Sequence, residues 1–116
     1  MDAISAALIG KALDGLNMRQ NFLAQNIANA NSPDYVPMGV TFEAELLEAS
    51  LRGMDSVESV EPDVVAIPMV EGQDAGMRLD MQLAESSKTA LRYSALIEVM
   101  ARQMSITRSA ITGGQG

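Results

Sequence analysis

The 116-residue sequence contains no cysteine and no histidine. Without cysteine there is no disulfide framework and no thiolate chemistry. Without histidine the chain lacks the commonest general base and the commonest metal ligand. A Ser-His-Asp triad and a zinc site are therefore excluded, and no Gly-rich phosphate loop occurs in the sequence. We expect a protein that is not an enzyme and that has no cofactor and no metal.

Long apolar runs and positive charge are also scarce. No run reaches the roughly 20 residues of a transmembrane helix, and the amino end lacks the basic and apolar regions of a cleaved signal peptide. Lys and Arg number 8 against 15 Asp and Glu, a net charge of −7. We therefore expect no direct membrane insertion, no signal cleavage and no binding to nucleic acid, which requires a positive surface.

Aromatic residues make up only 3% of the chain, although apolar residues make up 47% and methionines number nine. A core rich in alanine and methionine lacks large anchors and suits contacts between helices, where flexible methionine adapts to several neighbours. The acids concentrate in residues 34–78, which hold ten acids and two arginines and so have a net charge of −8, whereas both ends are near neutral.

Residues 3–30 have the periodicity of one long helix. The apolar positions step by four and three, which is heptad spacing, and Gln20 is a polar residue in this seam that would fix its register. Gly10 and Gly15 should each weaken the helix by roughly 1 kcal/mol relative to alanine. The expected packing seam of this helix consists of Ile9, Leu13, Leu16, Gln20, Leu23, Ile27 and Ala30.

The helix should end within a run of short amides. Asn26, Asn29 and Asn31 bond to nearby backbone and compete with the helical ladder. Pro33 then lacks an N–H and forces the preceding residue into extended backbone. Tyr35 is one of four aromatic residues and is placed to hold the departing segment. Residues 1–33 thus form the first part of the chain.

Residues 34–78 contain all four prolines and should be extended or irregular. The exception is a short helix near residues 41–52, capped by Thr41 and ended by Gly53. A short strand or hairpin around residues 64–70 is possible, and the rest of residues 54–76 has the composition of a mobile loop.

Residues 79–116 hold the longest expected helix, Leu79–Ile111, which contains no proline or glycine. We expect Gly113 and Gly114 to end it. The sequence therefore predicts a mainly α-helical fold, in which long terminal helices form a coiled-coil or tube domain around a short acidic middle segment with little β structure. The expected seam of the last helix consists of Leu79, Leu83, Ser86, Ala90, Tyr93, Ile97, Met100, Met104, Thr107 and Ile111.

The run Asn26-Ile-Ala-Asn-Ala-Asn-Ser-Pro-Asp-Tyr35 resembles the Asn-Ile-Ala-Asn-Ala-x-Thr-Pro-Gly-Tyr signature of the flagellar rod and hook axial proteins. Ser32 replaces threonine, and Asp34 replaces the glycine that a type II turn prefers; aspartate permits a type I turn instead, so the sequence leaves the turn type open. The resemblance covers residues 8–47 and 77–112. Within the axial protein family, the sequence is most similar to the proximal rod proteins. The matching motif residues are Asn26, Ile27, Ala28, Asn29, Ala30, Pro33 and Tyr35.

The resemblance implies a structural subunit of the flagellar basal-body rod that self-assembles through its terminal helices and transmits motor torque. It implies as partners other rod subunits, the ring–rod adaptor, the basal-body ring and the type III export apparatus, and a periplasmic location reached without signal cleavage. Asn26, Asn29, Pro33 and Tyr35 would shape a bend between layers, and Arg19, Gln20 and Arg92 would set register.

Two other interpretations stay open: a different rod protein, or a small acidic helical chaperone of type III secretion. Phe42 and Leu46 also resemble the short apolar element by which early export substrates engage their secretion gate. That pattern is common by chance, and helix packing is the simpler explanation for it.

Overall fold

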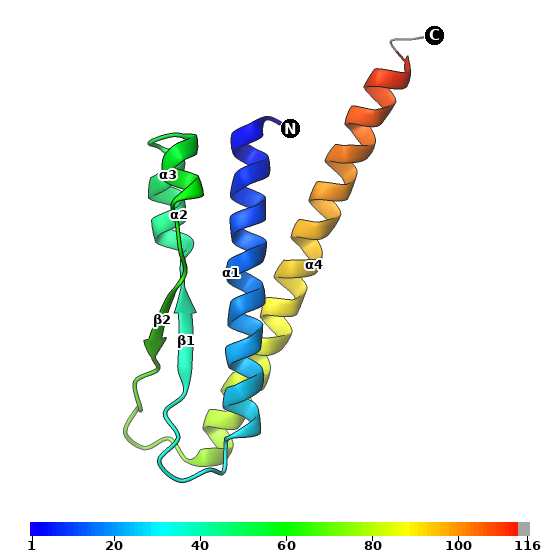
Figure 1. The fold of residues 1–116 in the computed structure, drawn as a ribbon. Coiled ribbons are helices and arrows are strands. Elements are labelled where there is room, and N and C mark those ends of the chain that lie inside the picture. The colour runs from blue at the N-terminus through cyan, green and yellow to red at the C-terminus, as the bar shows by residue number, and fades with distance from the viewer. Residues whose placement is uncertain (114–116) are drawn as a thin grey trace.

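The computed structural model describes residues 1–113 and is mainly α-helical, as predicted (Figure 1). Two long antiparallel helices from the ends of the chain lie side by side, and a smaller unit of two strands and two short helices packs on the other side of the first helix. The elements in order are α1 (Ala3–Ala28), β1 (Met38–Thr41), α2 (Glu43–Ser50), α3 (Met54–Glu58), β2 (Asp63–Ala66) and α4 (Ala75–Gly113).

Helix α1 begins where Asp2 caps it and ends within the asparagine run. The Asp2 carboxylate accepts a hydrogen bond from the Ser5 backbone N–H at 2.8 Å. Hydrogen bonds from Ser5 hold the pKa of Asp2 below its ordinary value, as expected for a carboxylate at a helix amino end. Asn29 closes the other end and donates its backbone N–H to Gln25 at 3.0 Å. The expected helix over residues 3–30 is therefore present and is two residues shorter.

The apolar core lies between α1 and the middle of the chain, not between the two long helices. Phe42 is 4% exposed, and its ring lies directly over the backbone of Gly15. A Cβ at Gly15 would come within 2.5 Å of ring carbons, so only glycine fits there. The glycine weakens the helix locally but admits the aromatic ring. The core consists of Leu16, Val40, Phe42, Leu46, Ala49, Val57 and Val60.

The middle segment is more ordered than the sequence suggests. Strands β1 and β2 pair antiparallel, from Met38 opposite Ala66 to Thr41 opposite Asp63. The strand considered possible around residues 64–70 is present as β2, over Asp63–Ala66, and residues 67–74 contain neither helix nor strand. The pairing of β2 with β1 was not expected, because four-residue strands are too short to show alternation and the two strands are distant in sequence. Within 54–76, α3 adds a further unpredicted element.

The short helix near residues 41–52 is present as α2, but its expected ends are corrected. Thr41 is the last residue of β1 and does not cap the helix; Phe42 takes the cap position without a side-chain bond. The helix ends at Ser50, before Gly53. Gly53 instead begins α3 with a φ of 120°, a backbone conformation that favours glycine. Tertiary packing of Phe42 thus overrides the local capping signal.

Helix α4 starts at Ala75, four residues earlier than expected, and the Asp74 carboxylate accepts the Met77 backbone N–H at 2.8 Å in its first turn. It packs along α1 and slants away from it toward the carboxyl end (Figure 1). The helix continues through Gly113, so that glycine does not end it, and Gly114 lies outside the described residues. Its least exposed residues at the contact are Gln82, Ser86, Thr89, Leu96, Met100 and Gln103.

The molecule is elongated, with extents of 64 × 28 × 18 Å. Its radius of gyration of 18.2 Å exceeds the roughly 13 Å expected for a compact domain of this length. Its accessible surface of 7797 Å² likewise exceeds the roughly 6,100 Å² expected for a compact monomer of this mass. Much surface that a globular domain would bury therefore stays uncovered in the single chain.

Candidate functional site at the asparagine junction

The junction where α1 ends is organised around the side chain of Asn26, which is 3% exposed. Its amide nitrogen donates to the Met38 carbonyl at 2.8 Å and to Gln82 Oε1 at 3.0 Å. Its amide oxygen accepts from the Tyr35 hydroxyl and from the Met38 N–H, both at 3.0 Å. One buried amide with both donors and both lone pairs satisfied therefore connects α1, the following loop, β1 and α4.

The turn after α1 is held by a second asparagine at the surface. Asn29 Nδ2 donates to the Gln25 carbonyl at 2.8 Å, and Asn29 Oδ1 accepts from Ser32 Oγ at 3.3 Å. The Tyr35 N–H then donates to the Ser32 carbonyl at 3.4 Å, which closes a four-residue turn with Pro33 in its second position.

Asp34 occupies the third position of this turn with a φ of 65°. A type I turn requires a negative φ at this position, so the turn is not the type I alternative that aspartate would permit. The backbone keeps the left-handed conformation that glycine would adopt, as in a type II turn, and aspartate tolerates it better than most residues. Turn geometry here follows from the surrounding bonds and from Pro33 more than from the residue type.

The remaining motif residues have less buried positions. Ile27 and Ala30 are half-buried, whereas Ala28 and Pro33 are exposed. The structure thus brings Asn26 and Tyr35 into direct contact and leaves Ala28 and Pro33, which lie between them, at the surface. It also adds two residues that the sequence did not single out, Met38 and Gln82. Periodicity offers one clue to Gln82, which lies four residues before Ser86 in line with the seam.

A second polar connection crosses the middle of α1. The Arg19 guanidinium donates to both carboxylate oxygens of Glu43, at 2.7 and 2.8 Å, and to the Val40 carbonyl at 2.6 Å. It also lies 5.0 Å from the centre of the Phe42 ring. Arg92 of α4 approaches the same carboxylate at 3.9 Å. Hydrogen bonds from Arg19 hold the pKa of Glu43 below its ordinary value.

Gln20 provides a third connection between the long helices, as its Nε2 donates to Ser86 Oγ at 3.0 Å. Polar residues in a helix contact fix register because a shift along the axis leaves them unpaired. Three contacts thus connect α1 with α4. Gln20 faces Ser86, and Asn26 faces Gln82. Arg19 and Arg92 share the carboxylate of Glu43. These pairs hold α1 and α4 in one antiparallel alignment.

The expected packing seams divide into buried and exposed positions. On α1, Leu16 and Leu23 are buried, and Ile9, Leu13 and Gln20 are half-buried. On α4, Met100 is half-buried. The face of α4 that meets α1 runs through Thr89 and Leu96, about 60° round the helix from the expected seam. Leu83, Tyr93, Ile97 and Met104 are consequently exposed in the single chain.

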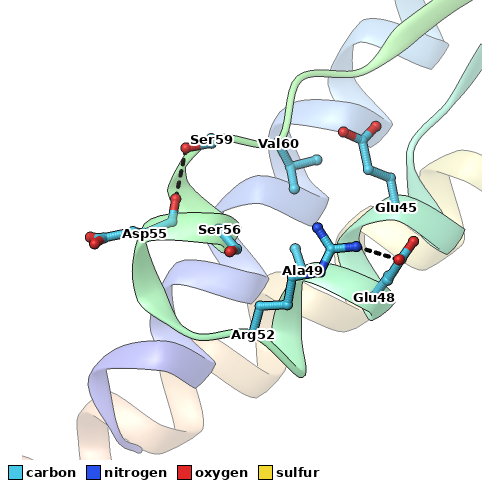
Figure 2. Close-up of a pocket in the computed structure, with 8 residues that line it drawn as sticks. All are labelled: Glu45, Glu48, Ala49, Arg52, Asp55, Ser56, Ser59 and Val60. Atoms are coloured by element: carbon cyan, nitrogen blue, oxygen red, sulfur yellow. Dashed lines mark hydrogen bonds and ion pairs between the residues drawn. The ribbon is translucent and has the colours of Figure 1, made fainter.

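A shallow hollow of about 310 Å³ lies between α2 and α3, with Ala49 and Val60 at its floor (Figure 2). Two contacts join polar groups at its wall: Arg52 pairs with Glu48, and Ser59 Oγ donates to the Asp55 carbonyl at 2.7 Å. Within residues 1–113 no three acidic side chains lie close enough to hold a metal ion, and no helix is long and apolar enough to cross a membrane.

Comparison with known proteins gives one consistent result. The chain is 46% identical over 49 residues to the flagellar basal body rod protein FlgB of Borrelia hermsii, covering 42% of this chain and 36% of that protein. It is 27% identical to the Bacillus subtilis protein of the same name over 116 aligned positions, covering 90% of both chains. It is 37% identical to the Escherichia coli protein of that name over 75 residues, covering 63% of this chain and 51% of that protein. No protein-family profile matches the chain.

Proposed function

The chain belongs to the FlgB family of flagellar basal body rod proteins, and from this we propose that it is a structural subunit of the rod that assembles through its terminal helices. The observation that supports this best is the uncovered apolar surface of α4. Leu83, Ile97 and Met104 are 47%, 43% and 59% exposed along one side of that helix. Large uncovered apolar surfaces mark sites of protein–protein contact.

A groove at the far end of the long helices supports the same proposal. Where α4 diverges from the amino end of α1, a groove of about 520 Å³ is lined mainly by methionine, alanine and isoleucine side chains. Met100 and Met104 lie on its α4 side and Met1 and Ala6 on its α1 side. A helix of a neighbouring subunit can fill such a groove, and flexible methionine adapts to the helix that it meets.

We also propose that the subunit transmits motor torque along the rod. A rod subunit must resist sliding of its helices, and the contacts from Asn26 and Gln20 to α4 oppose such sliding. Asn26, Asn29, Pro33 and Tyr35 would fix the bend between α1 and the next layer. Arg19, Gln20 and Arg92 would fix the register of the helices.

The partners proposed for this chain are further copies of itself, other rod subunits, the ring–rod adaptor and the basal-body ring. We propose a periplasmic position in the rod, reached through the flagellar export apparatus without cleavage of the amino end. Phe42 and Leu46 are 4% and 7% exposed in the folded chain, so any reading of them by the export gate requires an unfolded segment. Core packing accounts for both residues.

Mass spectrometry of basal bodies purified from the source bacterium tests the rod assignment. We expect recovery of this chain in fixed proportion to other rod proteins, with its amino-terminal peptide intact. An abundant soluble protein followed through the same purification controls for carry-over. Absence from the basal bodies together with abundance in the soluble fraction contradicts the proposal and favours a secretion chaperone.

A matched pair of charge insertions tests the role of the exposed seam. Ile97→Asp places a carboxylate on it, whereas Ser105→Asp places the same charge on an exposed position of α4 outside this seam. We expect the first variant to be lost from basal bodies and the second to be retained. Equal incorporation of both variants, each with wild-type helicity by circular dichroism, would show that this seam is not an assembly surface.

A further inference from the structure

Helix α4 carries a second apolar stripe that α1 does not cover and that the expected seam does not include. It lies about 130° round the helix from the face that meets α1. Leu91, Val99 and Ile106 are 72%, 45% and 55% exposed on it. The steps of three and four residues keep its members on one side. This outer seam consists of Lys88, Leu91, Ala95, Val99, Arg102 and Ile106, all exposed.

The charge around the outer seam is positive. Residues 86–113 hold four Lys and Arg and one acid. Lys88 lies three residues before Leu91, and Arg102 lies three residues after Val99; their side chains are 55% and 70% exposed. Each also pairs with a carboxylate of its own helix, Lys88 with Glu85 at 4.0 Å and Arg102 with Glu98 at 3.1 Å, so the net positive charge of this stretch comes also from Arg92 and Arg108. A partner surface should therefore combine apolar side chains with acids.

Helix α2 presents such a surface. Leu47 and Leu51 are 69% and 84% exposed and lie one turn apart on its outer side. Glu48, between them in sequence, is also exposed and pairs with Arg52 of its own chain, a pair that is itself at the surface. Residues 41–63, which include this helix, hold seven acids and one arginine. The α2 surface, defined by Leu47, Glu48 and Leu51, is thus apolar and acidic where the outer seam is apolar and basic.

The two surfaces cannot meet within one chain. Helix α1 lies between α2 and α4 and packs against both (Figure 1). A contact between them must join different copies. Since each copy would contribute a different surface, the contact is heterologous, and repetition of such a contact gives an open helical array unless a ring closes.

We propose that the outer seam of α4 docks on the α2 surface of a second copy of this chain. Leu91 and Val99 pack against Leu47 and Leu51, and Arg102 lies beside Glu48. The inference rests on the proposed rod function and adds to it the two surfaces that join successive subunits. Opposite charge sets the direction and specificity of the contact, and the apolar side chains provide its buried area.

The absence of cysteine makes a disulfide test unambiguous. Full-length Leu47→Cys and a longer, tagged Val99→Cys chain are mixed at increasing concentration with a mild oxidant, and non-reducing gels measure the mixed dimer. The control mixes Leu47→Cys with Val36→Cys, a loop position that is 56% exposed. We expect the mixed dimer to form about tenfold faster than the control pair, since the docked pair stays close together.

Charge reversal gives a second measurement on the same pair. Glu48→Lys should lower the mixed-dimer yield about tenfold, and adding Arg102→Glu to the other chain should restore it. Glu71→Lys makes the same charge change in the loop before α4 and should leave the yield unchanged. Circular dichroism of each variant verifies that the fold is retained.

Mixed-dimer yield no greater than the control overturns the inference, as does a dominant Leu47→Cys homodimer, which would mean a two-fold symmetric contact. Failure here is distinct from failure of the rod assignment. If basal bodies contain the chain while the mixed dimer fails, the rod function stands and the surface is wrong. If the mixed dimer forms but basal bodies lack the chain, the contact stands and the rod function is wrong.

Discussion

The two sides of α1 are packed by different means. On one side Leu16 meets Val40, Phe42 and Val57, which are each no more than 4% exposed, in a small apolar core. On the other side only Thr89 is buried among the residues described for α4. There the alignment is specified by hydrogen bonds from Gln20 and Asn26.

The difference separates folding from assembly. The core side has the burial of an ordinary small domain and can stabilise α1 with the middle segment in a single chain. On the α4 side the contacts are specific and polar, but burial of apolar side chains is incomplete. Helix α4 is therefore aligned on α1, while many of its apolar side chains stay exposed where further helices could pack. We therefore expect substitutions on the core side to change stability and substitutions on α4 to change association. The first prediction below tests this difference through stability, and the following four test the junction, the glycine contact, the turn and the Arg19–Glu43 pair.

Phe42→Ala should have the largest effect on the free energy of unfolding. Loss of a buried aromatic ring costs about 3–5 kcal/mol, which is a large part of the stability of a small domain. Leu91→Ala, at a position that is 72% exposed, should change it by less than about 0.5 kcal/mol. Urea unfolding followed by circular dichroism compares the two. Similar losses for both would remove the distinction between the two sides.

Asn26→Ala should cost about 2–4 kcal/mol, because it leaves the Met38 backbone groups and the Tyr35 hydroxyl without their partner in a buried site. Asn29→Ala removes bonds at the surface and should cost about 1 kcal/mol or less. The same urea titration measures both. Hydrogen exchange of the Met38 amide should accelerate only in the Asn26 variant. A loss in the Asn29 variant as large as that of Asn26→Ala would show that the buried network is not the stronger part of the junction.

Replacing two glycines of α1 by alanine should change the stability of the chain in opposite directions. Gly15→Ala forces a methyl group into the Phe42 ring and should destabilise the chain by about 1–3 kcal/mol. Around Gly10 nothing lies within 4 Å of an added Cβ, so Gly10→Ala should stabilise the chain by about 0.5–1 kcal/mol through helix propensity. Thermal unfolding measures both effects, as a lower unfolding temperature for Gly15→Ala and a higher one for Gly10→Ala. Stabilisation by Gly15→Ala would show that the ring does not lie on the helix backbone.

Asp34→Gly should stabilise the chain by up to about 1 kcal/mol, since glycine adopts the left-handed backbone of this turn without a steric cost. Asp34→Ala serves as the control, because it removes the same charge and keeps the Cβ. We expect the alanine variant to be no more stable than the parent. A gain of equal size in both variants would assign the effect to charge and not to backbone.

The smallest expected effect is a pH dependence from Glu43. Its pKa is lowered in the folded chain by hydrogen bonds from Arg19, so its contribution to stability is complete above the unfolded value of about 4.5 and is lost as the pH falls through the lower folded value. The carboxylate is half exposed, so the loss should be modest. Glu43→Gln should reduce the pH dependence of the urea unfolding midpoint below pH 4.5.

The two long helices were predictable from sequence because helix periodicity and its interruption by Pro33 are local signals. The core was not predictable, since it requires β1, α2 and α3 to fold back on α1. Gly15 was interpreted as a weak point in the helix, and only the position of Phe42 explains it. The pairing of β1 with β2 was likewise not predictable: a strand was considered near β2, but nothing in the sequence indicated β1 as its partner.

The site was predictable in part. Asn26 and Tyr35 were identified by their motif, but their direct contact and the bonds to Met38 and Gln82 depend on how α4 lies across α1. The expected seam of α4 has the right spacing but is centred about 60° round the helix from the face that meets α1, so that Ser86 and Met100 belong to both. Spacing shows which residues share a face, whereas the neighbour that covers the face is set by the rest of the molecule.

The polar contacts on the α4 side also give the molecule a mechanical direction. Gln82, Ser86 and Arg92 contact the rest of the chain at successive points along α4. A force along the helix axis loads these three contacts at the same time, whereas a force that lifts one end of α4 loads them one after another. The pair of long helices should therefore withstand shear far better than peeling.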